Sequence, residues 1–340
     1  MSYQIGIDTI HLRPTPRLAH TEYCSSEPLR RAVAAATGGQ TLEQAWEMDL
    51  LWSTNDGPVP WGQRGRVTDM GHAEFLEGGV DRRPPRQSPF QDPETVLAFD
   101  AVDEYGLPDF DELVAFYEQH YQQTQEANPG QAFPGGYYKT IVSGAIEAFG
   151  WDMLLEAAAD QDRFERVLDS IFRLSMHHYK AWAQTSIEFF ISHDDMVWSE
   201  GAFVHPDFYR RVIFPRYKEL WDVIRNAGKK LLFCSDGNWS EFVDDIALAG
   251  ADGFIFEAMT TLDPIVQKYG PTHVIVGSKV DCRTLTFGTL DEIKAEVDAT
   301  LDIAFDCPGF FFAIGNHIPS NIPVQNALFY FDYLKQHWNR

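Results

Sequence analysis

Residues 231–239 read Leu-Leu-Phe-Cys-Ser-Asp-Gly-Asn-Trp, and the rest of the chain is interpreted outward from them. Three apolar residues after a basic turn are typical of a short buried strand in a parallel sheet. Cys234 and Asp236 are two residues apart, so in an extended chain both side chains point to the same side. Gly237 and Asn238 then turn the chain into a helix that starts near Trp239. A thiol and a carboxylate placed together at the C-terminal end of a strand suit a metal or a polar substrate.

Short apolar runs alternate with helical patterns along most of the chain. Runs that predict strands lie at 140–143, 187–192, 231–233, 254–256, 274–276 and 310–314, and helical patterns lie at 27–36, 109–123, 151–179, 206–226, 240–249, 262–269 and 290–305. Strands that alternate with helices indicate a parallel sheet wrapped by helices. With one or two earlier strands the number approaches eight, so we predict an α/β fold, a (β/α)8 TIM barrel with an elaborated N-terminal segment.

The length of 340 residues fits one barrel with insertions as well as it fits two domains. We predict a single domain over residues 1–340, with an N-terminal elaboration and loops at 1–105 and the main barrel at 106–340. Residues 66–105 hold several prolines and show no sustained period, so an irregular excursion is expected there.

Composition and charge exclude several classes of partner. The formal net charge of -23 disfavours nucleic acid and anionic membranes, because their phosphate-rich surfaces would repel the protein. No apolar run approaches 18 residues and no apolar segment follows Met1, so we predict neither a membrane span nor a signal peptide, and a cytoplasmic protein. The four cysteines form no CxxC pair and are expected to be free thiols, while nine Trp favour an apolar or aromatic ligand pocket. Whether the chain forms a homodimer stays open.

Polar residues follow the predicted strands at the point where each strand ends. In a barrel these ends gather on one face, where the active site of such enzymes lies. The candidate metal ligands are Cys234, Asp236, Glu257 and His317. Zinc accepts sulfur, nitrogen and oxygen ligands and takes about four of them. The alternative is structural: Cys234 as a small buried residue, Asp236 as a helix cap and Glu257 bonded to backbone amides.

A second group of candidates comes from the end of the preceding strand and from the tryptophans. Asp194 and Asp195, with Glu257, are the candidate catalytic residues, because adjacent carboxylates can share a proton or orient a polar ligand. Substrate binding is predicted for His193, Trp198 and Trp239. The alternatives are a turn with a capping role for residues 193–195 and core packing for the tryptophans. The sequence contains no GxGxxG, Walker, GxSxG or HExxH motif, which disfavours nucleotide binding through a standard loop.

The C-terminal part of the chain, roughly residues 140–338, resembles the uroporphyrinogen decarboxylase superfamily, which includes the corrinoid-dependent methyltransferases. The resemblance is carried by Ser192-His193-Asp194-Asp195, Pro206, Pro215-Arg216-Tyr217-Lys218, Cys234-Ser235-Asp236-Gly237-Asn238, Gly250-Ala251-Asp252-Gly253, Gly277 with Asp281, and Gly315-Asn316-His317-Ile318-Pro319 with Pro323 and Asn326. It implies a (β/α)8 barrel, in agreement with the periodicity.

The methyltransferase branch is nearer than the true decarboxylases, whose Arg-rich N-terminal loop is not found in this sequence. In that branch zinc is bound by a strand that ends in His-x-Cys, by a glutamate after the next strand and by a Cys in the last glycine-rich turn. Glu257 matches the glutamate, whereas Cys234 replaces the His, Asp236 replaces the first Cys and His317 lies in the region of the last Cys. These exchanges give a harder, more oxygen-rich set of ligands, which suits an ether or phenolate oxygen.

The resemblance therefore implies a zinc-dependent methyltransferase. It would transfer a methyl group from a methyl ether, expected to be a methoxylated aromatic, to the cobalt of a corrinoid (cobalamin) carried by a partner protein. The first alternative is a carboxy-lyase similar to uroporphyrinogen decarboxylase that acts without metal. The second is a barrel that binds a small molecule or corrinoid without turnover.

Overall fold

Seven parallel strands form one sheet in the order β1-β7-β6-β5-β4-β3-β2 in the computed structural model, which describes residues 2–58, 88–315 and 317–340. The strands are β1 (Ala19–His20), β2 (Gly135–Tyr137), β3 (Phe189–His193), β4 (Lys230–Cys234), β5 (Gly253–Ile255), β6 (Val274–Gly277) and β7 (Phe310–Phe312). Apart from β1 beside β7, neighbours in the sheet are consecutive in sequence, which is the arrangement of a (β/α)8 barrel. The predicted fold class is confirmed.

An extended segment around Asp49 closes the sheet between β1 and β2. The Asp49 amide donates to the His20 carbonyl of β1 at 2.8 Å, and the Ala132 amide donates to the Asp49 carbonyl at 2.9 Å. Leu50 and Ala132 form a parallel bridge just before β2. Residues 49–51 thus take the eighth place around the barrel, so the N-terminal part of the chain completes the barrel wall.

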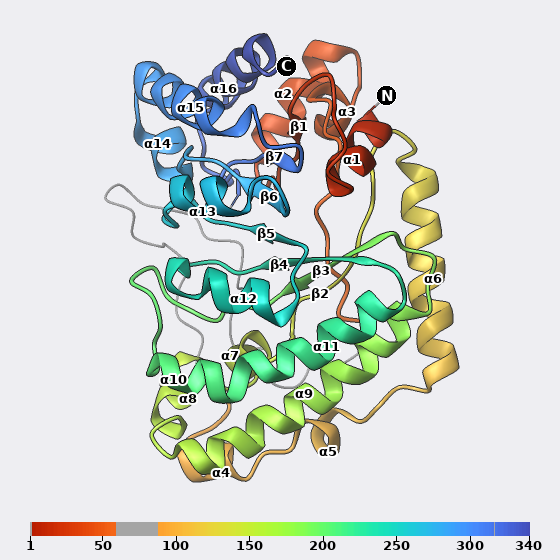
Figure 1. The fold of residues 1–340 in the computed structure, drawn as a ribbon, viewed down its shortest axis with the longest axis vertical. Helices are drawn as coiled ribbons and strands as arrows, with labels where there is room; N and C mark the ends of the chain where they lie inside the picture. The colour runs from red at the N-terminus through yellow and green to blue at the C-terminus, as the bar shows by residue number, and fades with distance from the viewer. Residues whose placement is uncertain (1, 59–87, 316) are drawn as a thin grey trace.

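Helices surround this wall (Figure 1). They are α1 (Ser2–Ile10), α2 (Glu27–Thr37), α3 (Leu42–Ala45), α4 (Pro93–Leu97), α5 (Ala101–Tyr105), α6 (Phe110–Ala127), α7 (Val142–Phe149), α8 (Trp151–Ala157), α9 (Gln161–Ala183), α10 (Pro206–Phe208), α11 (Phe214–Asn226), α12 (Val243–Ala249), α13 (Leu262–Tyr269), α14 (Cys282–Phe287), α15 (Leu290–Ala304) and α16 (Val324–His337), with a π turn at Tyr209–Ile213 and a 3-10 turn at Ser240–Phe242. Helices α9 and α11 run side by side below the strands, and α15 and α16 cover the opposite side.

Two separate apolar clusters lie on the two faces of the barrel wall. The larger one packs the outer faces of the strands against the helices. The smaller one fills the interior and consists of Ile7, Ile10, Ala19, Leu50, Ala132, Phe189, Ile191, Leu232, Cys234, Val274, Val276, Phe311 and Ala313. Alternate residues of β3, β4 and β6 belong to it, as expected for side chains that point to opposite faces in turn. His193 follows Ile191 by two residues, so it continues the inward-facing row.

Most predicted elements agree with the structure, but two predictions are wrong. Residues 140–143 do not form a strand: β2 lies earlier, and α7 begins at Val142. Every residue of α7 is buried, which makes the start of this helix indistinguishable from a buried strand in sequence. The irregular excursion predicted at 66–105 contains α4 and α5 at its end, whereas its residues 66–87 lie outside the described part of the chain. The prediction of a single domain stays a prediction.

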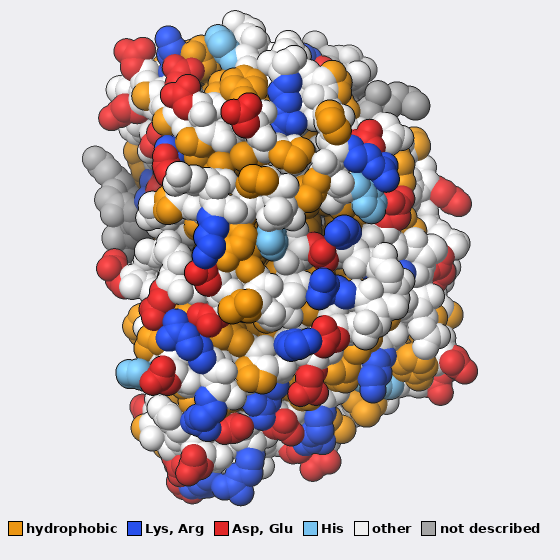
Figure 2. Space-filling view, in the orientation of Figure 1, with side chains coloured by type: hydrophobic (Ala, Val, Ile, Leu, Met, Phe, Trp, Pro, Cys, Tyr) orange, Lys and Arg blue, Asp and Glu red, His pale blue; other side chains and the backbone are white. Residues whose placement is uncertain are grey.

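The surface over α9, α11 and α12 carries interspersed acidic and basic side chains (Figure 2). Arg211 and Arg216 of the 209–226 segment pair with Glu165 of α9 at 2.8 and 3.4 Å, and Arg210 pairs with Asp245 of α12 at 3.1 Å. The Arg210 and Arg211 side chains are exposed, and ion pairs at such positions each contribute little to stability. Across the described residues, the structure contains no helix with the length and apolar character that crossing a membrane requires.

His178, a buried histidine that stacks on Tyr137 of β2, leads us to predict that the free energy of unfolding falls in acid. His178 of α9 is fully buried, its Nδ1 lies 2.7 Å from the Tyr117 hydroxyl, and burial, with a smaller contribution from His177, lowers its pKa to about 3. The unfolded chain takes up this proton near pH 6.5 and the folded chain does not, so stability falls as the pH drops below 6.5. Chemical unfolding of wild type and His178→Gln at pH 7.5 and 5 should show that wild type loses about 2 kcal/mol more than the variant. Equal losses in both proteins would contradict this.

Candidate functional site

Three side chains that can bind a metal lie together at the C-terminal ends of β3 and β4. His193, Asp195 and Asp236 each offer one ligand atom, and these atoms lie within 4.8 Å of one another. The register of the two strands causes this, because His193 pairs with Cys234 and the residues two positions later stay side by side. His193 and Asp195 are buried, whereas Asp236 is partly exposed. The cluster is therefore open toward the mouth of the barrel on the Asp236 side.

Asp195 is the centre of the hydrogen bonds in this cluster. Its Oδ1 lies 2.9 Å from His193 Nε2 and accepts the Asp236 amide at 2.9 Å, and its Oδ2 accepts the Tyr138 hydroxyl at 2.8 Å. Burial would raise the pKa of Asp195, but the His193 ring and these hydrogen bonds hold the pKa below its usual value. The other ring nitrogen, His193 Nδ1, is buried and has no hydrogen-bond partner among the described residues. A buried polar atom without a partner indicates a missing ligand or water.

Aromatic rings cover the adjoining part of the mouth. The Tyr138 ring stacks on His193 with centroids 3.9 Å apart, and Trp52 contacts the same imidazole edge-on at 5.3 Å. Tyr23 packs against Trp52 at 5.2 Å and lies 6.3 Å from His317. Tyr23, Trp52 and Tyr138 follow β1, the closing segment and β2, and each is partly exposed. We call these three residues the aromatic wall.

Cys234 lies just inside the cluster, in the interior of the barrel. Its side chain belongs to the interior apolar cluster and is 4% exposed. Burial, followed by the charges of Asp236, Asp195 and Glu257, raises the pKa of the thiol well above its usual value. The thiol is therefore neutral unless a metal displaces its proton. Cys234 is not part of the three-residue cluster found among the described residues, and its role as a ligand stays a prediction.

Glu257 and His317, the other predicted ligands, flank the site. The Gly237 amide donates to Glu257 Oε2 at 2.5 Å, so this carboxylate holds the turn that follows Asp236. Gly237 has a φ of +82°, and a Cβ there would lie 2.7 Å from the Trp198 carbonyl oxygen, so only glycine fits. His317 is buried beside Tyr23. Metal binding by Glu257 and by His317 stays a prediction.

The remaining predicted residues have contacts outside the metal cluster. Asp194 is fully buried and accepts the backbone amides at the start of α7 and the Tyr217 hydroxyl, so its contacts are those of a helix cap. Trp239 is fully buried, stacks on Phe256 at 4.4 Å and donates its indole N–H to the Ser235 carbonyl. Trp198 is 42% exposed. The catalytic role of Asp194 and the substrate-binding roles of the two tryptophans stay predictions.

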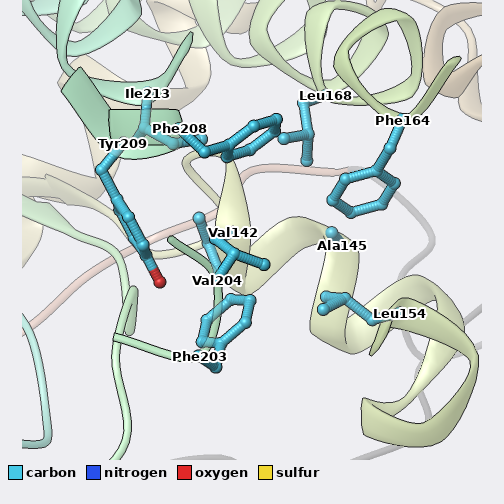
Figure 3. A pocket seen from close by; sticks show the side chains of 10 residues that line it. All are labelled: Val142, Ala145, Leu154, Phe164, Leu168, Phe203, Val204, Phe208, Tyr209 and Ile213. Atoms are coloured by element: carbon cyan, nitrogen blue, oxygen red, sulfur yellow. The ribbon is translucent and has the colours of Figure 1, made fainter. Parts of the chain in front are cut away.

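A small cavity elsewhere in the molecule does not compete with this site. Figure 3 shows apolar side chains turned toward a common space, and they come from α7, α8, α9 and the 203–213 segment. The cavity has a volume of about 10 Å³ and is lined by Val142, Ala145, Leu154, Phe164, Leu168, Phe203, Val204, Phe208, Tyr209 and Ile213. It is about large enough for one water molecule and offers that water almost no polar partner, so it is a packing gap in the outer core.

Comparison with models of known protein families shows which family the chain belongs to. The family model described as uroporphyrinogen decarboxylase (URO-D) matches residues 145–337, which is more than half of the 340 residues. The chain belongs to the uroporphyrinogen decarboxylase family. The family is one of enzymes, and its matched region contains β3 to β7 and therefore all three residues of the metal cluster.

One curated relative and one solved structure are similar to the chain. The chain is 26% identical over 171 residues to a uroporphyrinogen decarboxylase of Syntrophotalea carbinolica, and the match covers 50% of this chain and 48% of that protein. It thus spans about half the length of the curated relative. A solved methyltransferase from Methanosarcina mazei superposes with a TM-score of 0.66 over 98% of both chains at 15% identity. At that identity the likeness shows the shared fold.

Proposed function

We propose that this member of the uroporphyrinogen decarboxylase family is a zinc-dependent methyltransferase. It would transfer a methyl group from a methyl ether, specifically a methoxylated aromatic, to the cobalt of a corrinoid bound to a partner protein. The observation that carries the proposal is the cluster of His193, Asp195 and Asp236 at the mouth of the barrel. This is the end of the barrel at which enzymes of this fold keep their active sites.

The donor atoms of the cluster fit a divalent metal. One imidazole and two carboxylates are ligands that zinc accepts, and two carboxylates balance its double charge. His193 would bind through one ring nitrogen only, and Nε2 is the one that lies on the side of Asp195. Zinc bound by these residues would supply a Lewis acid that lowers the basicity of the departing ether oxygen. Cys234, Glu257 and His317 are proposed as further ligands or neighbours of the metal.

The protein's own residues would bind and orient the methyl donor. The aromatic wall offers ring surfaces beside His193, against which a methoxylated ring can stack. The corrinoid would supply the electron pair for the new bond to the methyl carbon, and the ether oxygen would keep the electron pair of the broken carbon–oxygen bond. The oxygen would then take up a proton, and we propose the partly exposed Glu257 carboxylate as the group that relays it from solvent.

The charge around the site argues against the alternative of a metal-free carboxy-lyase. Asp195, Asp236 and Glu257 all raise the pKa of Cys234, so their negative charges converge on one place. Lys139, a buried cation in the described part of the chain beside Tyr138, is already paired with Glu147 at 2.9 Å. A substrate with many carboxylates would be repelled there.

Metal content tests the proposal first. Elemental analysis of the purified wild type should find about one zinc per chain, and Asp195→Asn and Asp236→Asn should each lower the zinc affinity by more than about 100-fold and lose the zinc on purification, because each loses a charged ligand. Asp244→Asn is the matched control: this carboxylate is exposed on α12 and paired with Lys268 at 2.7 Å, so its loss should leave zinc binding unchanged. Zinc retained in both cluster variants would refute this site.

Activity is tested with the zinc-loaded protein, a methoxybenzene and free cob(I)alamin as the acceptor. Formation of methylcobalamin, followed by absorbance, is expected for wild type and for Asp244→Asn but not for Asp236→Asn. Absence of zinc from wild type, together with decarboxylation of uroporphyrinogen, would replace the proposal with the carboxy-lyase alternative.

A further inference from the structure

We propose that Tyr138 is a positioning residue that fixes Asp195 and His193 in the orientation needed to hold the metal. The inference rests on the proposed function, because it concerns the same metal cluster. Tyr138 directly follows β2, the strand next to β3 in the barrel, and its side chain reaches both residues.

The hydroxyl group of Tyr138 controls Asp195. It donates to Asp195 Oδ2 at 2.8 Å, while Oδ1 is held by His193 Nε2 and by the Asp236 amide, each at 2.9 Å. Both carboxylate oxygens are thus fixed, and the plane of the carboxylate is defined from three directions. Without the hydroxyl, Oδ2 would lose this hydrogen bond and the carboxylate could rotate about its last bond. A ligand that must be reordered on metal binding binds more weakly.

The ring of Tyr138 controls His193. The two rings stack with centroids 3.9 Å apart and planes inclined by 20°, and Trp52 packs against the imidazole from another direction at 5.3 Å. These contacts hold the imidazole in one orientation, in which Nε2 lies beside the Asp195 carboxylate, so that the two groups can bind one metal together. One side chain therefore orients two of the three members of the cluster.

The backbone and the ring of Tyr138 are themselves held by contacts with Asp56 and Lys139. Its amide donates to Asp56 Oδ1 at 2.7 Å, and the Lys139 ammonium lies 4.0 Å from the centre of its ring. Lys139 is buried and fixed by Glu147 at 2.9 Å, with Asp56 at 3.9 Å. Lys139, Asp56 and Glu147 thus form a group of charges that contacts Tyr138 through its amide and its ring. Its arrangement indicates that the ring is a rigid support and not an adaptable surface residue.

Two substitutions of Tyr138 separate the effect of its hydroxyl group on zinc binding from the effect of its ring. Tyr138→Phe keeps the stack on His193 and removes only the hydrogen bond to Asp195, whereas Tyr138→Leu removes both. We expect zinc affinity, measured by competition with a chromophoric chelator, to fall about 10- to 100-fold in Tyr138→Phe and further in Tyr138→Leu. The absorption bands of bound Co²⁺ should also change in Tyr138→Phe, because they report the geometry of the ligands.

Tyr137→Phe is the matched control. The Tyr137 hydroxyl is buried and has no hydrogen-bond partner among the described residues, so its removal should change neither zinc affinity nor the Co²⁺ spectrum. Unfolding of the metal-free proteins shows whether a variant is merely less stable. Unchanged zinc affinity and Co²⁺ bands in Tyr138→Phe would refute the positioning role while leaving the proposed function intact. A wild type that binds no zinc would refute both.

Discussion

Asp194→Ala is expected to lower the free energy of unfolding by about 3–5 kcal/mol, although the neighbouring Asp195 is the residue that we place in the metal site. Asp194 Oδ2 accepts the amides of Ile141 and Val142 at 3.1 and 3.0 Å, and Oδ1 accepts the Ser143 amide at 2.5 Å. These are the free amides at the start of α7, a helix without a cap from its own flanking residue. The alanine variant leaves them buried without an acceptor.

The same carboxylate joins a second helix to this point. The Tyr217 hydroxyl of α11 donates to Asp194 Oδ2 at 2.6 Å, so the substitution also releases a contact between α11 and the end of β3. Burial raises the pKa of Asp194 to about 6, so unfolding should be measured at pH 8, where the carboxylate is ionised and the full set of hydrogen bonds is present.

Asp195→Ala is the control for this prediction. Two of the donors to Asp195, the Asp236 amide and the Tyr138 hydroxyl, belong to partly exposed residues, where water can replace the lost oxygen atoms, so the loss of Asp195 should cost less than half as much stability. Zinc binding should show the reverse order, with Asp194→Ala retaining zinc in its folded fraction and Asp195→Ala losing it. If Asp195→Ala proved the more destabilising of the two, the division of roles between these neighbours would be wrong.

The regular part of the barrel could be predicted because strands buried on both faces appear as apolar runs. The run at 231–233 lies within β4, and the helical pattern at 262–269 has the bounds of α13. The spacing of Cys234 and Asp236 also predicted that both side chains point to one side. Local periodicity carries this information without knowledge of the neighbouring strands.

The strand β2 could not be found in this way, because its sequence is Gly-Gly-Tyr. The reason for the glycines lies far away in sequence. A Cβ at Gly135 would lie 2.4 Å from the Ile187 side chain, and one at Gly136 would lie 2.8 Å from the Ser53 carbonyl oxygen. Glycine here permits close approach of other segments, which a local pattern cannot reveal. Because the strand was predicted five residues too late in the chain, at 140 instead of 135, Tyr138 was not recognised as the residue at its end.

The grouping of His193 with Asp195 and Asp236 also depends on information that the sequence lacks. The three residues meet because β3 and β4 pair with His193 opposite Cys234, and a register cannot be read from either strand alone. Asp194 and Asp195 looked equivalent in sequence. The alternation of side chains sends Asp194 outward to α7 and α11, and Asp195 inward to the mouth.

Arg17→Met should lower the free energy of unfolding by about 3–5 kcal/mol, because it leaves the buried Asp49 carboxylate without its cation. Arg17 makes two hydrogen bonds to Asp49, at 2.7 and 2.8 Å, and also packs over the Trp338 ring at 4.2 Å. Asp49 is fully buried, and its carboxylate accepts the His20 amide at 2.9 Å. Denaturant unfolding of both proteins measures the difference.

The position of Asp49 makes this pair a requirement for barrel closure as well as a local contact. The backbone amide and carbonyl of Asp49 join β1 to Ala132 at the eighth place of the wall. If the unpaired carboxylate moved toward solvent to become hydrated, residues 49–51 would lose their hydrogen bonds to both neighbours. Replacing Asp49 by asparagine in the Arg17→Met background removes the charge and keeps an acceptor for the His20 amide. The double variant should therefore recover at least about 2 kcal/mol relative to Arg17→Met alone. A double variant that is no more stable than Arg17→Met would show that the packing of Arg17 on Trp338, and not its ion pair with Asp49, provides the stability lost in Arg17→Met.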